Sequence, residues 1–220
     1  MKTVQFGEKR VAVSKVVCIG RNYVEHIEEL GNEIPENMVV FNKPNSAISD
    51  TLYYFSEKCR FEGEICFLIR SGRIAGVGFG LDLTHADIQN RLKQKGLPWE
   101  RAKAFDHSAV LSRFAVFGGT VESLHMKLYR NDRLVQYAGY DLMMYKPAAM
   151  LEEIQTFMTL EDNDIIMSGT PKGVATYDRG DRFVGQVFSG TKLLVEASWI
   201  VQEEGPFVAS NQRSRKEERS

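Results

Sequence analysis

Two glutamates at the start of an apolar run constrain this chain more than any other feature of its sequence. Glu62 and Glu64 lie in RFEGEICFLI, a run that alternates and then becomes continuously apolar, which predicts a β-strand. Because side chains alternate across a strand, both carboxylates are expected on the same face. Asp82 follows at the end of a second short strand, GVGFGLDL. The fold must therefore either expose these carboxylates to water or neutralise them.

If the three acids converge on one point, their mutual repulsion has to be offset. A single like-charge pair at about 4 Å costs roughly 4 kcal/mol at an effective dielectric near 20. A hard divalent cation removes this cost, and Mg²⁺ suits such a site because it uses few protein carboxylates and leaves positions for water and substrate. The alternative is that Glu62 and Glu64 only form the wet face of a strand, since an isolated Glu-x-Glu pattern is unspecific.

The overall composition is that of an ordinary globular protein with one substantial domain. The chain has 220 residues, with 28 basic and 29 acidic side chains and a net charge of -1, so nucleic acid and anionic membranes are not expected partners. No apolar run reaches the roughly 20 residues of a spanning helix, and the first residues lack the features of a signal peptide. The three cysteines have no metal-type spacing. The cytoplasm is the predicted location.

A histidine and a glutamate in the first predicted helix are spaced for acid–base chemistry. His26 and Glu29 are three residues apart, so on a helix they share one face. The carboxylate would then orient the imidazole, which is a suitable general base for activating water near neutral pH. The alternative is that both are surface charges on a polar helix.

Two further segments carry candidate chemistry. Lys103, after a Pro-Trp turn, would supply a compact positive charge for a developing oxyanion or enolate, or would simply be solvated. In SGTPKGV, residues 168–174, a strand ends in a turn where Thr170 and backbone amides would bind an anionic group. The alternative is a plain Pro-Gly turn.

The periodicity of the remaining chain predicts mostly strands with a few short helices. Residues 1–14 read as a short strand or a hairpin with Gly7 and Glu8 in the turn, and residues 124–139 as a hairpin with Asn131 and Asp132 at its turn. Helices are expected at 21–32, at 84–96 with Thr84 as the cap, and at 148–160 with one apolar side. The apolar side of the last helix contains Met150, Ile154, Phe157 and Met158. Further strands are predicted at 14–20, at 39–48 with a break at Pro44, and in a C-terminal meander formed by 164–169, 181–188 and 191–201.

Taken together, six segments resemble the fumarylacetoacetate hydrolase family, and in particular its short single-domain acylpyruvate hydrolases and oxaloacetate decarboxylases. The segments are CIGRNYVEHIEE, FNKPNSAI, FEGEICFLI, LDLTHADIQ, KGLPWERAKAFD and SGTPKGV, in the order of the family and between about Val16 and Val187. The resemblance implies an α+β, predominantly β fold, namely a mixed β-sandwich roll with a few short helices. The resemblance places the catalytic domain at 15–205. Residues 1–14 are expected to form a strand or hairpin that packs on it, and the polar, charged end (206–220) is expected to be a flexible tail.

The resemblance also assigns roles to individual residues. The metal-binding acids fall on Glu62, Glu64 and Asp82. The catalytic dyad falls on His26 and Glu29, and the active-site lysine is Lys103. The residues expected to bind the substrate are Arg21, Lys43, Gln89 and Thr170. The implied cofactor is Mg²⁺, with Mn²⁺ or Ca²⁺ as alternatives, and the implied assembly is a homodimer.

One departure from the family pattern concerns the substrate. Where the family usually has an arginine before the aspartate of its A-R-D-x-Q run, this chain has Ala86. A guanidinium at this place would bind a carboxylate bidentately. Its loss predicts a pocket for a short neutral acyl group rather than for a second carboxylate, or the loss of a structural pairing.

The predicted activity is metal-dependent hydrolysis of the C–C bond of a short acylpyruvate to pyruvate and a carboxylic acid, with decarboxylation of oxaloacetate as a second activity. Both reactions need an enolate to be stabilised. An isomerase, hydratase or decarboxylase of dienoic or oxo acids from aromatic catabolism is the enzymatic alternative. A protein that binds small acids without catalysis is the alternative of another class, and retention of the His26 and Glu29 pair argues against it.

Overall fold

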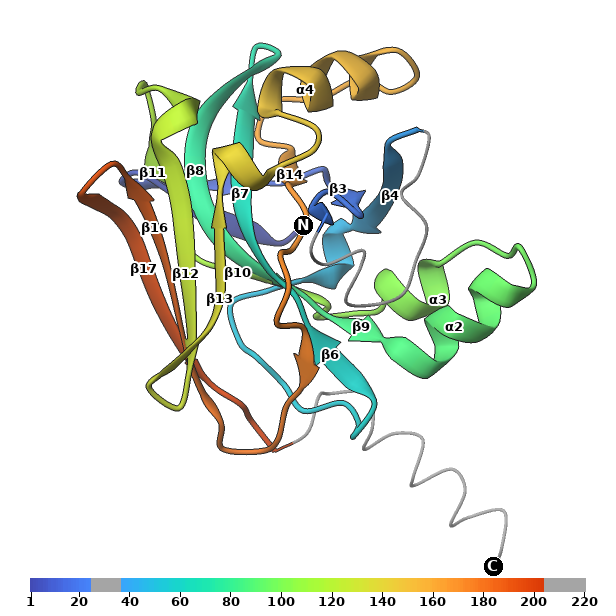
Figure 1. The fold of residues 1–220 in the computed structure, drawn as a ribbon. Helices are drawn as coiled ribbons and strands as arrows, with labels where there is room; N and C mark the ends of the chain where they lie inside the picture. Colours follow the sequence, from blue (N-terminus) through green and yellow to red (C-terminus); the bar gives the residue numbers. More distant parts are fainter. Residues whose placement is uncertain (25–36, 204–220) are drawn as a thin grey trace, which may run out of the picture.

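The computed structural model describes residues 1–24 and 37–203, and two packed β-sheets dominate them (Figure 1). The larger sheet has eight strands in the order β4-β3-β14-β7-β8-β10-β5, with β11 added against β8. Its strands are β3 (Lys15–Gly20), β4 (Val39–Pro44), β5 (Ile48–Ser49), β7 (Gly63–Arg70), β8 (Arg73–Asp82), β10 (Ala109–Leu111), β11 (Ala115–Val116) and β14 (Ile165–Met167). Pairing is antiparallel except between β14 and β3 and between β10 and β5.

The second sheet has four antiparallel strands in the order β13-β12-β16-β17. Its strands are β12 (Leu124–Arg130), β13 (Arg133–Gly139), β16 (Arg182–Ser189) and β17 (Lys192–Ile200). Asn131 and Asp132 join β12 to β13 with φ angles of 50° and 64°. Positive φ at both central residues is typical of the tight hairpin turns that match the twist of the strands. The hairpin predicted at 124–139 is confirmed.

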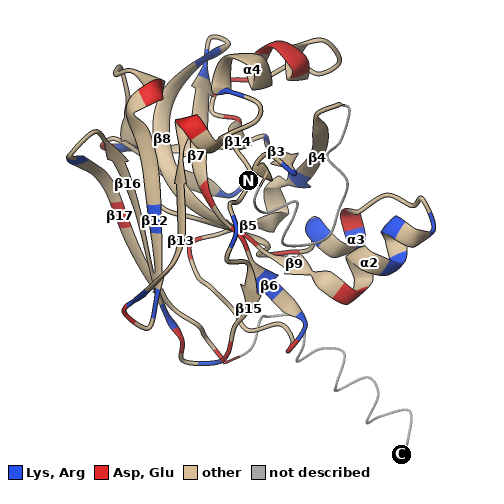
Figure 2. Cartoon of the chain, in the orientation of Figure 1, with Lys and Arg blue, Asp and Glu red and all other residues tan. Residues whose placement is uncertain are grey.

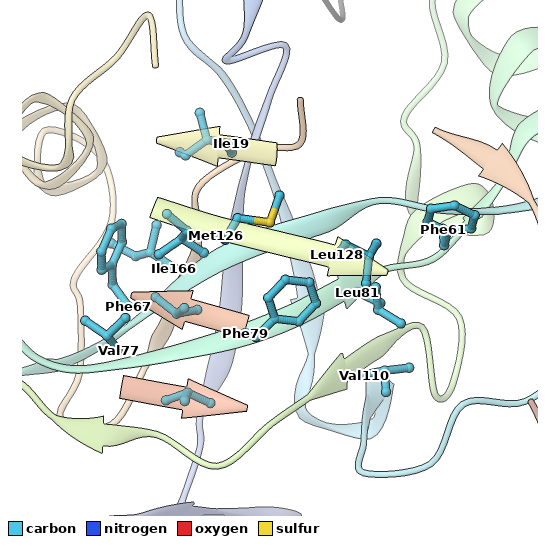
Figure 3. Close-up of a cluster of buried hydrophobic side chains, with 14 of the residues drawn as sticks. Ile19, Phe61, Phe67, Val77, Phe79, Leu81, Val110, Met126, Leu128 and Ile166 are labelled. Atoms are coloured by element: carbon cyan, nitrogen blue, oxygen red, sulfur yellow. The ribbon is translucent and has the colours of Figure 1, made fainter. Parts of the chain in front are cut away.

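The main core lies between these two sheets (Figure 3). Met126 and Leu128 of β12 are fully buried against Phe67 of β7 and Phe79 and Leu81 of β8. Alternation along each strand directs these side chains inward. Because β7 and β8 also carry the acidic residues at their ends, the core fixes the position of that part of the chain.

Smaller elements surround the two sheets. A three-stranded sheet contains β15 (Ala175–Thr176), β6 (Cys59–Phe61) and β9 (Thr84–His85) in that order. The helices that lie wholly within the described residues are α2 (Ala86–Gln94), α3 (Glu100–Lys103) and α4 (Pro147–Gln155), and the 3-10 turns there are η1 (Asn45–Ala47), η2 (Val121–Ser123) and η3 (Tyr140–Leu142). Helices α2 and α3 lie together at one side of the molecule, next to β9 (Figure 1).

The N-terminal hairpin is present and packs on the larger sheet. Strands β1 (Thr3–Phe6) and β2 (Lys9–Ala12) pair through a turn at Gly7 and Glu8. The backbone of Phe114 donates to Gln5 and accepts from Gly7, and Val4 belongs to a second buried apolar cluster. The first residues are therefore part of the packed structure.

Several expectations from the sequence need correction. The predicted C-terminal meander is wrong, because β14 pairs with β3 and β7 in the larger sheet while β16 and β17 belong to the other sheet. The helix expected from Thr84 begins at Ala86, since Thr84 is a strand residue whose hydroxyl bonds to Glu62. Phe157, expected on the buried side of its helix, is 57% exposed and lies beyond the end of α4. The helix predicted at 21–32 falls largely outside the described residues.

The predominantly β, α+β fold class is confirmed. Strand 39–48 breaks at Pro44 into β4 and β5, as predicted. Among the described residues, no helix has the length and apolar character needed to cross a membrane. Basic and acidic side chains are interspersed along the described chain (Figure 2).

A close contact between the two sheets at Gly185 gives a test of the packing. A Cβ on Gly185 of β16 would lie 2.3 Å from the buried ring of Phe79, whereas a Cβ on Gly118 would meet nothing within 4 Å. We expect Gly185→Ala to lower the free energy of unfolding by about 1–3 kcal/mol through overpacking. Gly118→Ala should change it by less than about 0.5 kcal/mol. Urea denaturation of both variants would measure this, and equal midpoints would contradict the packing.

Candidate functional site

The β7–β8 hairpin brings the three candidate metal ligands together. Glu62 lies between β6 and β7, Glu64 is the second residue of β7, and Asp82 is the last residue of β8. In the antiparallel register Glu64 is opposite Gly80, and the Asp82 amide donates to the Glu62 carbonyl at 2.8 Å. One carboxylate oxygen from each acid lies within 4.8 Å of the others. We call these three residues the acid cluster.

Two lysines offset most of the charge of the acid cluster. Lys103 Nζ lies 2.9 Å from Glu62 Oε2 and 2.6 Å from Asp82 Oδ2. Lys43 Nζ lies 2.7 Å from Asp82 Oδ1. This contact is an ion pair, but its angles are not those of a hydrogen bond. Thr84 Oγ1 donates to Glu62 Oε1 at 2.6 Å. Three carboxylates thus face two ammonium groups.

Burial changes the acidity of these groups. Glu64 and Asp82 are 2% and 1% exposed. Burial, followed by repulsion from Asp82 and Glu62, raises the pKa of Glu64 well above its usual range. Burial on its own lowers the pKa of Lys103, but the Asp82 and Glu62 carboxylates outweigh it, so this pKa is raised and the lysine stays protonated.

The donor set of the acid cluster fits a small, hard divalent cation. All three donors are carboxylates, which are the ligands preferred by Mg²⁺ and Ca²⁺. Glu64 Oε2 is oriented by a 2.7 Å hydrogen bond from the Gly169 amide. Added positive charge would also favour the ionised form of Glu64, which burial opposes.

Lys43 is fully enclosed, although the sequence suggested a residue of the substrate pocket. Its ammonium group, which pairs with Asp82, donates to the carbonyl of Lys103. It also donates to the carbonyl of Ser108 at 3.2 Å and to the hydroxyl of Ser108 at 3.0 Å. These contacts join β4 to the end of α3, so they hold the Lys103 backbone in place.

The other predicted substrate residues occupy different settings in the structure. Thr170 is 4% exposed, and its hydroxyl donates to Gly63 at 3.0 Å and accepts from Gln136 at 2.9 Å. Gln89 is half-buried on α2. Arg21 has a positive φ of 55°, and its buried Nε has no hydrogen-bond partner among the described residues. Their roles toward a substrate stay predictions.

Of the predicted dyad and the departure at residue 86, only residue 86 lies in the described part of the chain. His26 and Glu29 lie outside the described residues. Ala86 is the first residue of α2 and is 7% exposed, and its amide donates to the Lys58 carbonyl at 3.2 Å. Any side chain replacing Ala86 would therefore begin from a buried position.

Sequence analysis missed three residues that support the acid cluster. Thr84 bonds to Glu62, Ser108 bonds to Lys43, and Gln136 bonds to the backbone of Gly63. Gln136 carried little signal, because RLVQYAG does not alternate regularly and burial alternates only over residues 135–138. Thr84 and Ser108 follow ordinary patterns for a helix cap and a loop.

Comparison with known proteins identifies the family of this chain. Residues 15–198 match the family profile described as fumarylacetoacetate (FAA) hydrolase C-terminal. The chain belongs to the fumarylacetoacetate hydrolase family. This confirms the resemblance, which rested on six short segments.

Relatives within the fumarylacetoacetate hydrolase family have named activities. Oxaloacetate tautomerase YcgM of Escherichia coli strain K12 is 37% identical over 200 residues, which cover 82% of this chain and 91% of that protein. A mitochondrial oxaloacetate tautomerase of Saccharomyces cerevisiae is 29% identical and covers 89% of this chain and 95% of its own length.

Solved structures of the fumarylacetoacetate hydrolase family also superimpose on this chain. Fumarylpyruvate hydrolase from Pseudomonas aeruginosa, in complex with Mn²⁺ and pyruvate, has a TM-score of 0.84 at 27% identity and covers 92% of this chain and 96% of that one. 5-Carboxymethyl-2-hydroxymuconate delta-isomerase from Mycobacterium smegmatis has a TM-score of 0.73 at 26% identity, with coverage of 89% and 81%.

The enclosed position of Lys43 leads to a prediction about stability. Lys43→Met would leave Asp82 with one ammonium partner fewer and would remove the donor from the Lys103 and Ser108 carbonyls. Breaking a buried pair from one side costs about 3–5 kcal/mol. Arg182→Met, which breaks an exposed pair with Asp132, should cost about 1 kcal/mol or less. Denaturation in urea measures both, and similar losses would show that the Lys43 pair is not structurally important.

Proposed function

We propose that this protein is a divalent-metal-dependent enzyme that acts on short 2-oxo acids by way of their enolates. The observation that carries the proposal is the acid cluster, in which three carboxylates converge beside the buried ammonium group of Lys103. A site of this kind suits reactions in which negative charge develops on a substrate oxygen.

In this proposal Glu62, Glu64 and Asp82 hold the cation. Mg²⁺ is our first choice, with Mn²⁺ or Ca²⁺ as alternatives. When bound, such a cation would polarise the 2-oxo group and carry part of the charge that develops there. The Mn²⁺ and pyruvate in the Pseudomonas aeruginosa fumarylpyruvate hydrolase support this choice of ligand class.

Lys103 supplies a fixed positive charge. Its pKa is raised, so it keeps its proton at neutral pH. The Glu62 and Asp82 carboxylates hold its ammonium group in place, and Lys43 and Ser108 hold its backbone carbonyl. A preorganised charge of this kind stabilises an enolate without reorganisation at the moment of reaction.

Proton transfer is assigned to His26, oriented by Glu29. Their spacing in the sequence supports this role. In tautomerisation the base would move a proton between carbon 3 and the 2-oxo oxygen of oxaloacetate. In hydrolysis it would take a proton from water, which adds to the distal carbonyl of an acylpyruvate, and the C–C bond would then break to release a carboxylic acid and the enolate of pyruvate.

Two substrates are therefore candidates, and relatives favour each of them. The names of the Escherichia coli and Saccharomyces cerevisiae relatives favour oxaloacetate tautomerisation, which we place first because the former is 37% identical. Hydrolysis of an acylpyruvate, our prediction from the sequence, is supported by the Pseudomonas aeruginosa structure. The Mycobacterium smegmatis isomerase keeps the alternative in aromatic catabolism open for test.

A panel of assays separates these functions. The purified protein would be given enol-oxaloacetate, keto-oxaloacetate, acetylpyruvate and fumarylpyruvate, each with Mg²⁺, with Mn²⁺ and with a chelator. We expect metal-dependent loss of enol absorbance with oxaloacetate and slower release of pyruvate from the acylpyruvates. Binding of these acids without any turnover would instead support a non-catalytic acid-binding protein.

The predicted homodimer, cytoplasmic location and absence of nucleic-acid and membrane partners are kept as part of this proposal. The balanced charge of -1 supports the last of these. The yeast relative is named as mitochondrial. Light scattering after size-exclusion chromatography would report the mass of the assembly.

A first prediction concerns the metal ligands. Glu64→Gln keeps the shape of the side chain but removes its charge, so Mn²⁺ affinity in calorimetry should fall by at least about 10²-fold. Glu196→Gln, on the outer strand β17, is the matched control and should bind Mn²⁺ as the wild type does. Unchanged affinity in Glu64→Gln would refute the metal site.

A second prediction concerns the dyad. His26→Ala removes the proposed base, so hydrolysis of acetylpyruvate should fall by roughly 10²–10⁴-fold. Decarboxylation of oxaloacetate needs no activated water and should fall less. Steady-state kinetics on both substrates measures the ratio, and equal losses would show that His26 does not activate water.

A further inference from the structure

A buried glutamine links the acid cluster to the opposite sheet. Gln136 lies on β13, at the edge of the four-stranded sheet, where it is opposite Leu128 of β12. It is 2% exposed, and its neighbours Val135 and Tyr137 are more accessible to solvent. Its side chain therefore points inward, where its amide oxygen reaches the backbone of Gly63 at the start of β7. Figure 1 shows β13 next to β7. A buried amide at such a position requires partners for both its oxygen and its nitrogen.

The amide oxygen of Gln136 fixes the residue between two acids of the cluster. It accepts a hydrogen bond from the Gly63 amide at 2.8 Å. Gly63 separates Glu62 from Glu64, and a Cβ at this position would lie 2.8 Å from the same amide oxygen. Glycine is therefore needed for this approach. The position of Gln136 thus bears directly on the backbone from which two of the three carboxylates project.

The amide nitrogen of Gln136 holds the turn that follows β14. It donates to Thr170 Oγ1 at 2.9 Å and to the Pro171 carbonyl at 3.0 Å. The donors and acceptors around the amide fix which atom is oxygen and which is nitrogen. A glutamate could not make these bonds as an ion, because it has no donor.

Thr170 closes these contacts into a ring. Its hydroxyl, which accepts from Gln136, donates to the Gly63 carbonyl at 3.0 Å. Both polar groups of Gly63 are thus engaged by side chains that also bond to each other. In the same turn the Gly169 amide donates to Glu64 Oε2. One ring therefore sets both the backbone between the glutamates and the turn that orients the second of them.

We propose that Gln136 is a positioning residue for the acid cluster, and that the affinity of the site for a divalent cation depends on it. The inference rests on the proposed function, because it treats the acid cluster as a metal site. Residues that orient metal ligands typically change metal affinity by 10–100-fold when they are replaced. Gln136 would act through Gly63 and the Gly169–Thr170 turn, without touching the metal or the substrate.

The test compares two identical substitutions on the same sheet. Gln136→Met keeps the approximate volume and removes the amide, while Gln186→Met removes the amide of a glutamine on β16 that bonds to Glu196. Calorimetry and electron paramagnetic resonance with Mn²⁺ alone would be run well below the unfolding temperature of each variant. We expect about 10–100-fold weaker Mn²⁺ binding for Gln136→Met and wild-type binding for Gln186→Met. Binding by folded Gln136→Met within twofold of the wild type overturns the inference.

A second pair of variants keeps the test valid if Gln136→Met does not fold. Thr170→Val breaks the ring with nearly the same shape, and Thr170→Ser keeps the hydroxyl. Weaker Mn²⁺ binding in Thr170→Val with recovery in Thr170→Ser supports the ring, and equal binding in both refutes it. Where Gln136→Met folds, combining it with Thr170→Val should add little further loss, because both break the same ring. A wild type that binds no Mn²⁺ would instead refute the proposed function.

Discussion

Electrostatic repulsion within the acid cluster is the constraint around which the rest of the site is arranged. Two of its carboxylates are almost fully buried, where isolated charges are expensive. Two ammonium groups offset part of this negative charge. Lys103 bridges Glu62 and Asp82, and Lys43 pairs with Asp82 from another element. These lysines come from α3 and β4, so neutralising the acids draws separate parts of the chain together.

The packing between the sheets makes this arrangement rigid. Phe79 and Leu81 of β8 are buried against the four-stranded sheet, and Asp82 directly follows them. On the other face of the same strand, a Cβ at Gly80 would lie 2.6 Å from the sulfur of Cys66. Close packing on both faces leaves the end of β8 little freedom to relax. The carboxylates are thus held together although they repel each other.

Sequence patterns predicted those elements of the fold that are formed by residues close together in the chain. The hairpins at β1–β2 and β12–β13 and the break at Pro44 all depend on neighbouring residues. The single strand predicted for RFEGEICFLI is interrupted at Glu62, which lies between β6 and β7. The position of β14 between β3 and β7 depends on contacts between residues far apart in the sequence, such as Ile165 with Val16 and with Leu68, and periodicity carries no information about such pairing.

The site likewise has features that the sequence predicted and features that depend on contacts between distant elements. The acids and Lys103 were found as types and spacings that suit the chemistry, and a family resemblance strengthened the assignment. The full burial of Lys43 was not predicted, because its partners Asp82, Lys103 and Ser108 lie on elements distant in sequence. Thr84 was misread as a helix cap because the cap pattern does not reveal that a carboxylate lies nearby. Tertiary contacts decide the role of such residues.

Fold and acid cluster together do not determine the reaction. Structures named as a hydrolase and as an isomerase superimpose on this chain with TM-scores of 0.84 and 0.73, so the scaffold is compatible with both names. Enolate stabilisation by a cation and Lys103 would serve either reaction, since negative charge develops on a substrate oxygen in each.

The choice between these reactions must then be made by groups that move protons or contact the distal part of the substrate. In our proposal the first are His26 and Glu29, and the second would include α2, where Ala86 stands in place of the arginine usual in the family and Gln89 lies half-buried one turn further on. Specificity would thus be set at the margin of a charge cluster whose own geometry is fixed by the core.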